Sequence, residues 1–309
     1  MLFKKFKKNA RAFFSRSMWK KKAVWLSSDF PDYAVLRDGK LQLTKFNLEV
    51  PENKLEYILD GFDLLRDLYE IGGFEFKLEN EMLTATNQMI CLDIQTVEEL
   101  FILREVFVKE DYNFVTNCDV VVIDIGMNIG IASLYFALRK NVLHVYGYEP
   151  FAPTFQQCIR NLALNQRLSS KITASNFGLS DYGKTIEVDY DADHKGQVGI
   201  HGISLIKSHI NHTSKERIEL KSILSELEHI IGKHPGIDIV CKIDCEGAEY
   251  ELFRSFSEHG IPGPVRIIMM EWHECGSPEI LLTFLLNNGF KAVKRSSAKK
   301  HVGMIYAFR

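Results

Sequence analysis

The feature that most constrains the fold of this chain is the segment Val-Val-Ile-Asp-Ile-Gly-Met-Asn-Ile-Gly at 121–130. Its β-branched run predicts a buried strand that ends in Asp124, and the glycines predict a turn that opens a helix. A second apolar run ends at Glu149, 19 residues after Gly130. Ligands bind outside the carboxyl ends of strands in open α/β sheets, so these two acids predict a pocket for a nucleotide-like ligand.

The glycine turn also indicates which kind of nucleotide fits. Gly126 and Gly130 let the backbone approach a ligand closely, where a side chain would intrude. Asn128 stands where the dinucleotide fingerprint G-x-G-x-x-G has its second glycine, which disfavours a pyrophosphate. Asp124 could take up an ammonium group or a bound water and Glu149 both ribose hydroxyls, although either acid could instead cap the backbone. The expected ligand therefore carries a ribose and a positive charge.

From about residue 116 onward the pattern alternates between strands and helices. Apolar runs predict strands at 120–124, 143–149, 171–177, 237–243 and 265–271, and helices at about 129–140, 151–165, 222–231 and 246–259. Such alternation is typical of a parallel sheet that is covered by helices on both faces. The glycine-containing polar segment 190–216 is predicted to be a loop near the site.

The end of the chain predicts a change of strand direction. Ser277-Pro278 begins a helix that stops before Gly289, and strands follow at 290–294 and 302–308. The connection between these strands is too short for a parallel crossover, so they should pair antiparallel. The predicted fold class is α/β, with a Rossmann-like, seven-stranded, mostly parallel sheet and an antiparallel last strand.

The segment Lys-Ile-Asp-Cys-Glu-Gly-Ala-Glu at 242–249 places three acids where a strand passes into a helix. Glu246 and Glu249 could simply complement the positive end of the helix dipole. Asp244, at the strand end, is harder to explain in this way. We therefore take Asp244 as a candidate for both catalysis and cofactor binding, and Glu246 as a further catalytic candidate.

Glu271-Trp-His273 ends the next predicted strand. His273 could act as a general base near neutral pH, or it could be a histidine that is hydrogen-bonded in the core. Glu271 is a further catalytic candidate. Four of these side chains are suitable ligands for a divalent metal: Asp244, Glu246, Glu271 and His273. The sequence does not give the distances between them in space, so no metal site is assigned.

Several separated motifs together resemble the FkbM family of methyltransferases. They are D-I-G-M-N-I-G at 124–130, Y-E-P at 148–150, N-F-G-L-S-D at 176–181, K-I-D-C-E-G-A-E at 242–249 and E-W-H at 271–273. The resemblance covers residues 118–309 and implies a class I methyltransferase fold. It also implies S-adenosylmethionine as methyl donor and a hydroxyl acceptor, usually on a sugar, glycan or natural product.

The resemblance also implies roles for individual residues. The cofactor would be held by Asp124, Gly126, Asn128, Gly130 and Glu149, with Asn176 or Phe177 beside the adenine. Met127 stands where the family usually has alanine, which could narrow the pocket. The region before residue 116 matches only loosely, so acceptor specificity does not carry over.

The rest of the chain predicts two further parts, a segment at 1–32 and an accessory α+β region at 33–115, before the methyltransferase domain at 116–309. In the accessory region, apolar spacing predicts a helix from Leu55 to near Gly72, strands at 74–78 and 89–94, and a helix that Thr96 caps. No residue pattern there indicates chemistry.

Residues 1–22 contain nine Lys or Arg and no acid, in a chain of net charge −2. Phe3, Phe6, Ala10 and Phe13 form an apolar stripe at helical spacing, so this helix could lie on an anionic membrane surface or dock on its own domain. Basic residues interrupt every possible signal-peptide core, and no run approaches the roughly 20 apolar residues of a membrane span. We expect a cytoplasmic protein, with peripheral contact at the inner membrane surface as an option.

Two other functions compete with O-methyl transfer. A dinucleotide-dependent oxidoreductase would need the glycine that Asn128 replaces, and a non-catalytic membrane-associated binding module would not need the acids at the strand ends.

The expected partner is a small-molecule or glycan acceptor and not a nucleic acid, and the sequence assigns no oligomeric state. The six cysteines contain no Cys-x-x-Cys pair, and His209 and His212 are isolated from them, so zinc is disfavoured.

Overall fold

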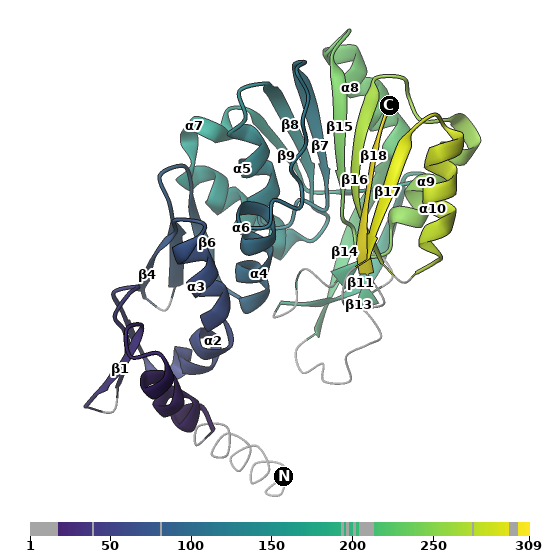
Figure 1. The fold of residues 1–309 in the computed structure, drawn as a ribbon. Coiled ribbons are helices and arrows are strands. Elements are labelled where there is room, and N and C mark those ends of the chain that lie inside the picture. Colours follow the sequence, from purple (N-terminus) through teal and green to yellow (C-terminus); the bar gives the residue numbers. More distant parts are fainter. Residues whose placement is uncertain are drawn as a thin grey trace, which may run out of the picture. The chain divides into compact units, whose positions relative to one another are not determined.

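The computed structural model describes residues 18–309, except 39, 81, 193–194, 196–197, 200–201, 204–212, 274 and 297–301. The chain forms two compact units, which divide between Lys109 and Glu110 (Figure 1). The boundaries predicted at 32/33 and 115/116 stay predictions. The apolar stripe predicted in residues 1–22 and the histidines at 209 and 212 lie outside the described residues.

The first unit combines short strands with helices. Its elements are a helix over 18–29, β1 (Ala34–Arg37), β2 (Lys40–Leu43), β3 (Leu48–Val50), η1 (Glu52–Lys54), α2 (Leu55–Asp60), α3 (Phe62–Glu70), β4 (Glu75–Glu79), β5 (Met82–Thr86), β6 (Cys91–Ile94) and α4 (Val97–Phe107). The strands form two antiparallel three-stranded sheets, β1-β2-β3 and β4-β5-β6. The predicted cap is confirmed, because Thr96 Oγ1 accepts a hydrogen bond from the N–H of Glu99 at 3.2 Å.

Two details of this unit differ from the sequence prediction. The helix predicted as continuous from Leu55 is broken into α2 and α3 at Gly61, where a Cβ would lie 2.9 Å from Leu100 Cδ1 of α4. Strands β1, β2, β3 and β5 were not predicted. Phe46 packs against the rings of Tyr33 and Phe62, which places an aromatic core in this unit.

The second unit is built on the predicted seven-stranded sheet, of order β17-β18-β16-β15-β7-β8-β9. The strands are β7 (Val120–Ile125), β8 (Val142–Tyr148), β9 (Ile172–Ser175), β15 (Asp238–Ile243), β16 (Val265–His273), β17 (Lys291–Ser296) and β18 (Val302–Phe308). Strand β18 runs antiparallel to both β16 and β17, and the other neighbouring pairs are parallel. The predicted fold class is therefore confirmed.

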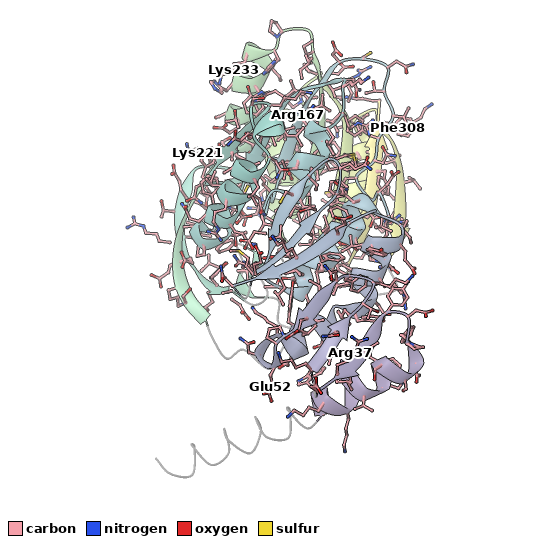
Figure 2. The ribbon with its side chains drawn as sticks, turned by 90° about the vertical axis from the view of Figure 1, so that its left-hand side faces the viewer. Arg37, Glu52, Arg167, Lys221, Lys233 and Phe308 are labelled. Atoms are coloured by element: carbon pink, nitrogen blue, oxygen red, sulfur yellow. The ribbon has the colours of Figure 1, made fainter. Side chains whose placement is uncertain are left out.

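Helices cover both faces of this sheet, and side chains fill the space between the layers (Figures 1 and 2). The helices are α5 (Ile131–Ala137), α6 (Ala152–Leu164), α7 (Gln166–Ser169), α8 (Ile223–Lys233), α9 (Glu249–His259) and α10 (Pro278–Asn287). Val121, Ile123 and Ile125 pack into the core that α8, α9 and α10 complete. Since side chains alternate along a strand, Asp124 faces the other side, toward α5.

A smaller sheet joins β10 (Gly178–Ser180), β14 (Thr213–Ser222) and β11 (Lys184–Asp191), and β12 (Val198–Gly199) pairs with β13 (Gly202–Ile203). The prediction of a loop over 190–216 was therefore wrong at both ends. In β14, buried Ile218 and Leu220 alternate with charged residues, so the strand is polar on average although one face is buried. Among the described residues, no helix has both the length and the apolar character needed to cross a membrane.

Candidate active site

The glycine turn after β7 fits closely against the segment that follows β15. Gly126 has φ +78, and a Cβ on this residue would lie 1.7 Å from the carbonyl oxygen of Asp244. The N–H of Asp244 in turn donates to the carbonyl oxygen of Ile125 at 3.0 Å. A residue other than glycine would push the two segments apart, so the glycine fixes the distance between the turn and the Asp244 segment.

Glu149, directly after β8, is buried and holds the turn from the other side. Its Oε2 accepts the N–H of Asn128 at 3.0 Å, and its Oε1 accepts the N–H of Phe151 at 3.0 Å. Burial raises the pKa of Glu149 to about 7, although these two hydrogen bonds oppose the effect. The predicted capping role is therefore present, and each oxygen keeps a second lone pair that could accept a ligand hydroxyl.

The turn ends in Gly130, which has φ +89 and precedes α5. Asn128 also has a left-handed backbone, with φ 51, and its Oδ1 accepts the N–H of Ile129 at 2.7 Å. Met127 is only 2 % exposed, and its Sδ lies 3.8 Å from Cys158 Sγ. Met127 therefore packs against Cys158 behind the turn, and the expectation that it narrows the pocket stays a prediction.

The two residues predicted to lie beside an adenine are placed on the segment after β9. Asn176 Nδ2 donates to the carbonyl oxygens of Glu149, at 2.9 Å, and Pro150, at 3.2 Å. The ring of Phe177 lies 5.3 Å from that of Tyr148, and Lys221 Nζ lies 3.8 Å from its centroid. Asn176 therefore fixes the backbone around Glu149, and adenine contact by either residue stays a prediction.

Asp124 is fully buried and bound within the protein. Its Oδ2 accepts a hydrogen bond from Ser133 Oγ of α5 at 2.6 Å, and its Oδ1 lies 3.1 Å from Lys242 Nζ. The register of β7 and β15 places Asp124 directly beside Lys242. The predicted contact with a ligand ammonium stays a prediction, and the geometry assigns Asp124 the additional role of fixing Lys242.

Lys242 is a site residue to which the sequence analysis gave no role. Its Nζ donates to the carbonyl oxygen of Gly126 at 2.6 Å and lies 3.6 Å from Asp244 Oδ2. Burial alone would lower the pKa of Lys242, but the charges of Asp124 and Asp244 outweigh it and the pKa is raised. Lys242 thus ties the glycine turn to the acidic segment, and its position between apolar strand residues was the available signal.

Asp244 is the more accessible of the two acids that contact Lys242, with 26 % of its side chain exposed. Its Oδ2 also accepts a hydrogen bond from the hydroxyl of Tyr112 at 3.0 Å. Both contacts are made to Oδ2, so they orient the carboxylate. No sequence pattern indicated Tyr112, because this contact joins residues far apart in the chain.

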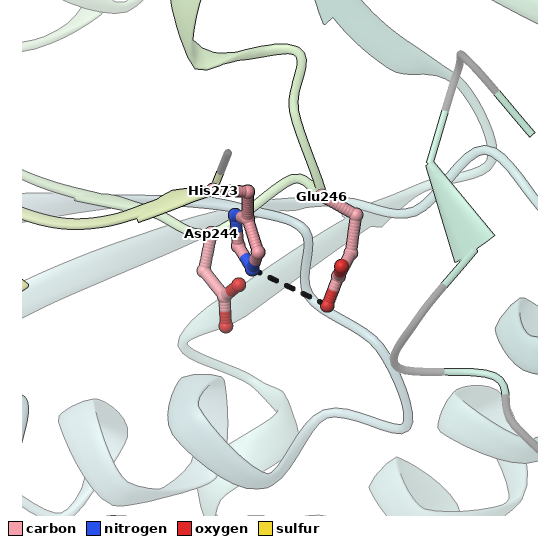
Figure 3. Close-up of side chains that lie close together, drawn as sticks. All are labelled: Asp244, Glu246 and His273. Carbon is pink, nitrogen blue, oxygen red and sulfur yellow. Dashed lines mark ion pairs between the residues drawn. The ribbon is translucent and has the colours of Figure 1, made fainter. Parts of the chain in front are cut away.

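His273, at the end of β16, lies between two acidic side chains of the segment after β15, Glu246 and Glu249. Figure 3 shows His273 and Glu246. His273 Nε2 lies 3.5 Å from Glu246 Oε1, and His273 Nδ1 lies 3.0 Å from Glu249 Oε1. Burial alone would lower the pKa of His273, but hydrogen bonds to Glu246 and Glu249 raise it to about 12. A protonated imidazole has no lone pair for an incoming proton, so this state does not serve the predicted role of general base.

The backbone explains why Glu246 lies in a loop although a helix was predicted from this residue. Glu246 has φ 51 and Gly247 has φ 102, so α9 begins only at Glu249. Burial raises the pKa of Glu246 to about 7, and His273 opposes this effect. A Cβ on Gly199 would lie 2.1 Å from the carbonyl oxygen of Glu246, so β12 packs on this loop.

Glu271 lies two residues before His273 on β16, opposite Met304 of β18. It is partly buried and does not belong to the group of Asp244, Glu246 and His273, whose ligand atoms all lie within 4.8 Å of one another. The structure thus brings together three of the four residues that were considered as metal ligands. A catalytic role for Glu271 stays a prediction.

The strand order, the antiparallel β18 and the acids at the strand ends define the class I methyltransferase fold. The Methyltransferase FkbM domain matches residues 124–292, which is more than half of the chain. This protein therefore belongs to the FkbM methyltransferase family, as the motifs predicted.

Individual relatives are more distant. The chain is 26% identical over 219 residues to methyltransferase sdnD of Sordaria araneosa, covering 64% of this chain and 84% of that protein. It is 26% identical over 238 residues to the AMB antimetabolite synthetase AmbE of Pseudomonas aeruginosa, covering 65% of this chain but 11% of that protein. The crystal structure of methyltransferase FkbM from Methylobacillus flagellatus aligns with TM-score 0.41 and 13% identity, covering 81% of this chain and 60% of that one.

Proposed function

We propose that this protein transfers a methyl group from S-adenosylmethionine to a hydroxyl group of an acceptor, on a sugar, glycan or other natural product. The observation that carries the proposal is the tight contact between the glycine turn and the Asp244 segment, at Gly126. This contact joins the half of the site that suits a nucleoside to the half that holds the acidic cluster. The family membership supports the same reaction class.

The residues of the turn fit the proposed cofactor. Glu149 has hydrogen-bond capacity left on both oxygens after it has bound the N–H groups of Asn128 and Phe151. Its partners hold it rigidly, so little side-chain entropy is lost when ribose hydroxyls bind. A dinucleotide is not supported, because Asn128 occupies the position of the fingerprint's second glycine and its N–H is bonded to Glu149.

The acceptor half would hold and orient the hydroxyl. When bound, S-adenosylmethionine supplies an electrophilic methyl group, whose bond to sulfur breaks with its electron pair as the bond to the acceptor oxygen forms. Asp244 is the base that we propose, because Tyr112 and Lys242 fix its Oδ2 and more than a quarter of the side chain is exposed. Alignment of the hydroxyl and exclusion of water would supply most of the remaining rate.

Calorimetry with S-adenosylhomocysteine tests the cofactor. Saturable binding at micromolar concentration is expected, and no binding at high micromolar concentration would exclude the proposed function. NADH, added to the same protein, should give no change in its fluorescence.

A mass-spectrometric screen with methyl-labelled cofactor tests the acceptor. Nucleotide sugars and lipid-linked glycans are the compounds to begin with, and labelled product should appear only with compounds that carry a free hydroxyl. Transfer only to amines would contradict O-methylation while leaving methyl transfer intact.

A further inference from the structure

Asp244, Glu246 and His273 are arranged as a metal site would be. Each offers one ligand atom, and these atoms all lie within 4.8 Å of one another (Figure 3). Because β15 and β16 are parallel neighbours, their carboxyl ends deliver residues from two distant motifs to one place. Two carboxylates and an imidazole are a donor set that divalent first-row metals accept.

A second observation comes from Glu249, which lies behind His273 and is fully buried. Its Oε1 contacts His273 Nδ1 at 3.0 Å and also accepts the N–H groups of Cys245 and Gly247, each at 3.2 Å. Metal-binding histidines commonly donate their second ring N–H to such a carboxylate, which fixes the ring. Here the fixed ring directs Nε2 toward Glu246.

One carboxylate oxygen of the buried Glu249 side chain also lacks a hydrogen-bond partner in the described part of the chain. Among the residues that the structure describes, its Oε2 has no hydrogen-bond partner, although the side chain is 0 % exposed. The nearby cation Lys242 is shared between Asp124, at 3.1 Å, and Asp244, at 3.6 Å. Four carboxyl groups, of Asp124, Asp244, Glu246 and Glu249, thus surround two basic side chains, Lys242 and His273. A bound divalent cation would offset this excess of acidic groups.

We propose that Asp244, Glu246 and His273 bind one divalent first-row cation, for which Mn²⁺ is the probe. His273 Nε2 would release its proton to water as the cation binds, and water and the acceptor hydroxyl would fill the remaining coordination positions. The catalytic part of this proposal rests on the proposed function. The cation would make the hydroxyl more acidic, and the proton would leave to water. The oxygen lone pair then forms the bond to carbon as the carbon–sulfur bond breaks, and the metal is neither oxidised nor reduced. Asp244 would in that case act as a ligand, and no free carboxylate base would be needed.

Binding of Mn²⁺ alone to the chelator-treated full-length protein tests the site. Titration followed by electron paramagnetic resonance should show one bound ion per chain. Asp244→Asn, Glu246→Gln and His273→Gln should each weaken binding by at least about tenfold, because even the loss of a residue that hydrogen-bonds a metal ligand typically costs about 10–100-fold. Asp238→Asn is the matched control, because Asp238 begins the same strand β15 and its partner is Arg266, at 3.9 Å. It should leave the affinity unchanged.

A measurement on the wild-type protein keeps the test valid if a variant fails to fold. Pulsed electron paramagnetic resonance of bound Mn²⁺ should show coupling to one nitrogen, that of His273. Equal Mn²⁺ affinity in the wild type and all three ligand variants, or bound Mn²⁺ without nitrogen coupling, would overturn the metal site.

The two proposals fail in different ways. Binding of S-adenosylhomocysteine without specific Mn²⁺ binding would overturn the metal site and leave the methyltransferase proposal standing. Specific Mn²⁺ binding without cofactor binding would support the metal site and exclude the proposed function.

Discussion

The two halves of the site are held together by different forces. On the β7–β8 side, the turn is fixed by backbone conformation and by two N–H groups bound to Glu149. On the β15–β16 side, charged side chains contact one another, and His273 lies between Glu246 and Glu249. The β7–β8 half is a rigid binding surface whose shape depends on the glycine turn. The second is a reactive cluster whose behaviour depends on charge.

The largest expected effect separates catalysis from cofactor binding. Asp244→Asn should lower turnover by at least about 100-fold, because it removes the charge that serves as base or metal ligand. The Kd for S-adenosylhomocysteine should change much less, since Glu149 and the turn remain. Steady-state kinetics and calorimetry on the same preparation measure both. Turnover above a tenth of the wild-type value would mean that the acidic half is not the reactive one.

A smaller effect is expected when the contact between the two halves is altered. Gly126→Ala should lower the free energy of unfolding by about 2–4 kcal/mol, because its Cβ would overlap the Asp244 carbonyl and its φ is left-handed. Gly236→Ala is the control, since its φ is +79 but nothing lies within 4 Å of the added Cβ. It should cost about 1–2 kcal/mol from backbone conformation alone. Denaturant unfolding of both variants measures the difference, and equal losses would contradict the packing role of Gly126.

Glu149→Gln should act on the first half only. It should weaken S-adenosylhomocysteine binding about tenfold or more, because charge-assisted hydrogen bonds to the ligand contribute about 1.5–3 kcal/mol each. Glu228→Gln, on the exposed face of α8, provides a matched control with the same chemical change. Calorimetry that gave all three proteins the same Kd would remove Glu149 from the cofactor site.

The smallest effect is a pH dependence of cofactor binding. Burial raises the pKa of Glu149 from 4.5 to about 7, so folding favours its protonated form. The stability that this contributes is fully present below pH 4.5 and is lost as the pH rises through about 7. Since the ionised form accepts ribose hydroxyls, affinity for S-adenosylhomocysteine should rise by up to roughly tenfold between pH 6 and 8. Calorimetry at both pH values should show that Glu149→Gln removes this rise, and a parallel rise in the variant would assign it to another group.

Local pattern was sufficient for the strands of the seven-stranded sheet in the second unit. Buried parallel strands such as β7 are continuous apolar runs, and β18 was identified as antiparallel because its connection to β17 is short. Local pattern failed where one residue breaks a helix, at Gly61, and where one face of a strand is charged, as in β14. In both cases the deciding contact is with a residue outside the element.

In the candidate site, too, some residues were predictable from local pattern and others depend on contacts between distant parts of the chain. The sequence was enough to recognise four acidic or basic residues, because each lies at or directly after the carboxyl end of a strand: Asp124, Glu149, Asp244 and His273. Lys242 and Tyr112 were not, because their roles exist only when β15 lies beside β7 and Tyr112 reaches Asp244. The sequence assigned Asp124 to the ligand, which stays a prediction, and the structure adds its contacts with Ser133 and Lys242.

The sequence by itself determined the family, the alternating α/β architecture and the glycine turn with its two acids. These depend on residue type and on spacing along the chain, which are local quantities. Only the tertiary structure decided that Asp244, Glu246 and His273 converge within 4.8 Å, with Glu249 behind the imidazole. Their charges and protonation depend on burial and on distances through space, and those are set when the strands assemble into a sheet.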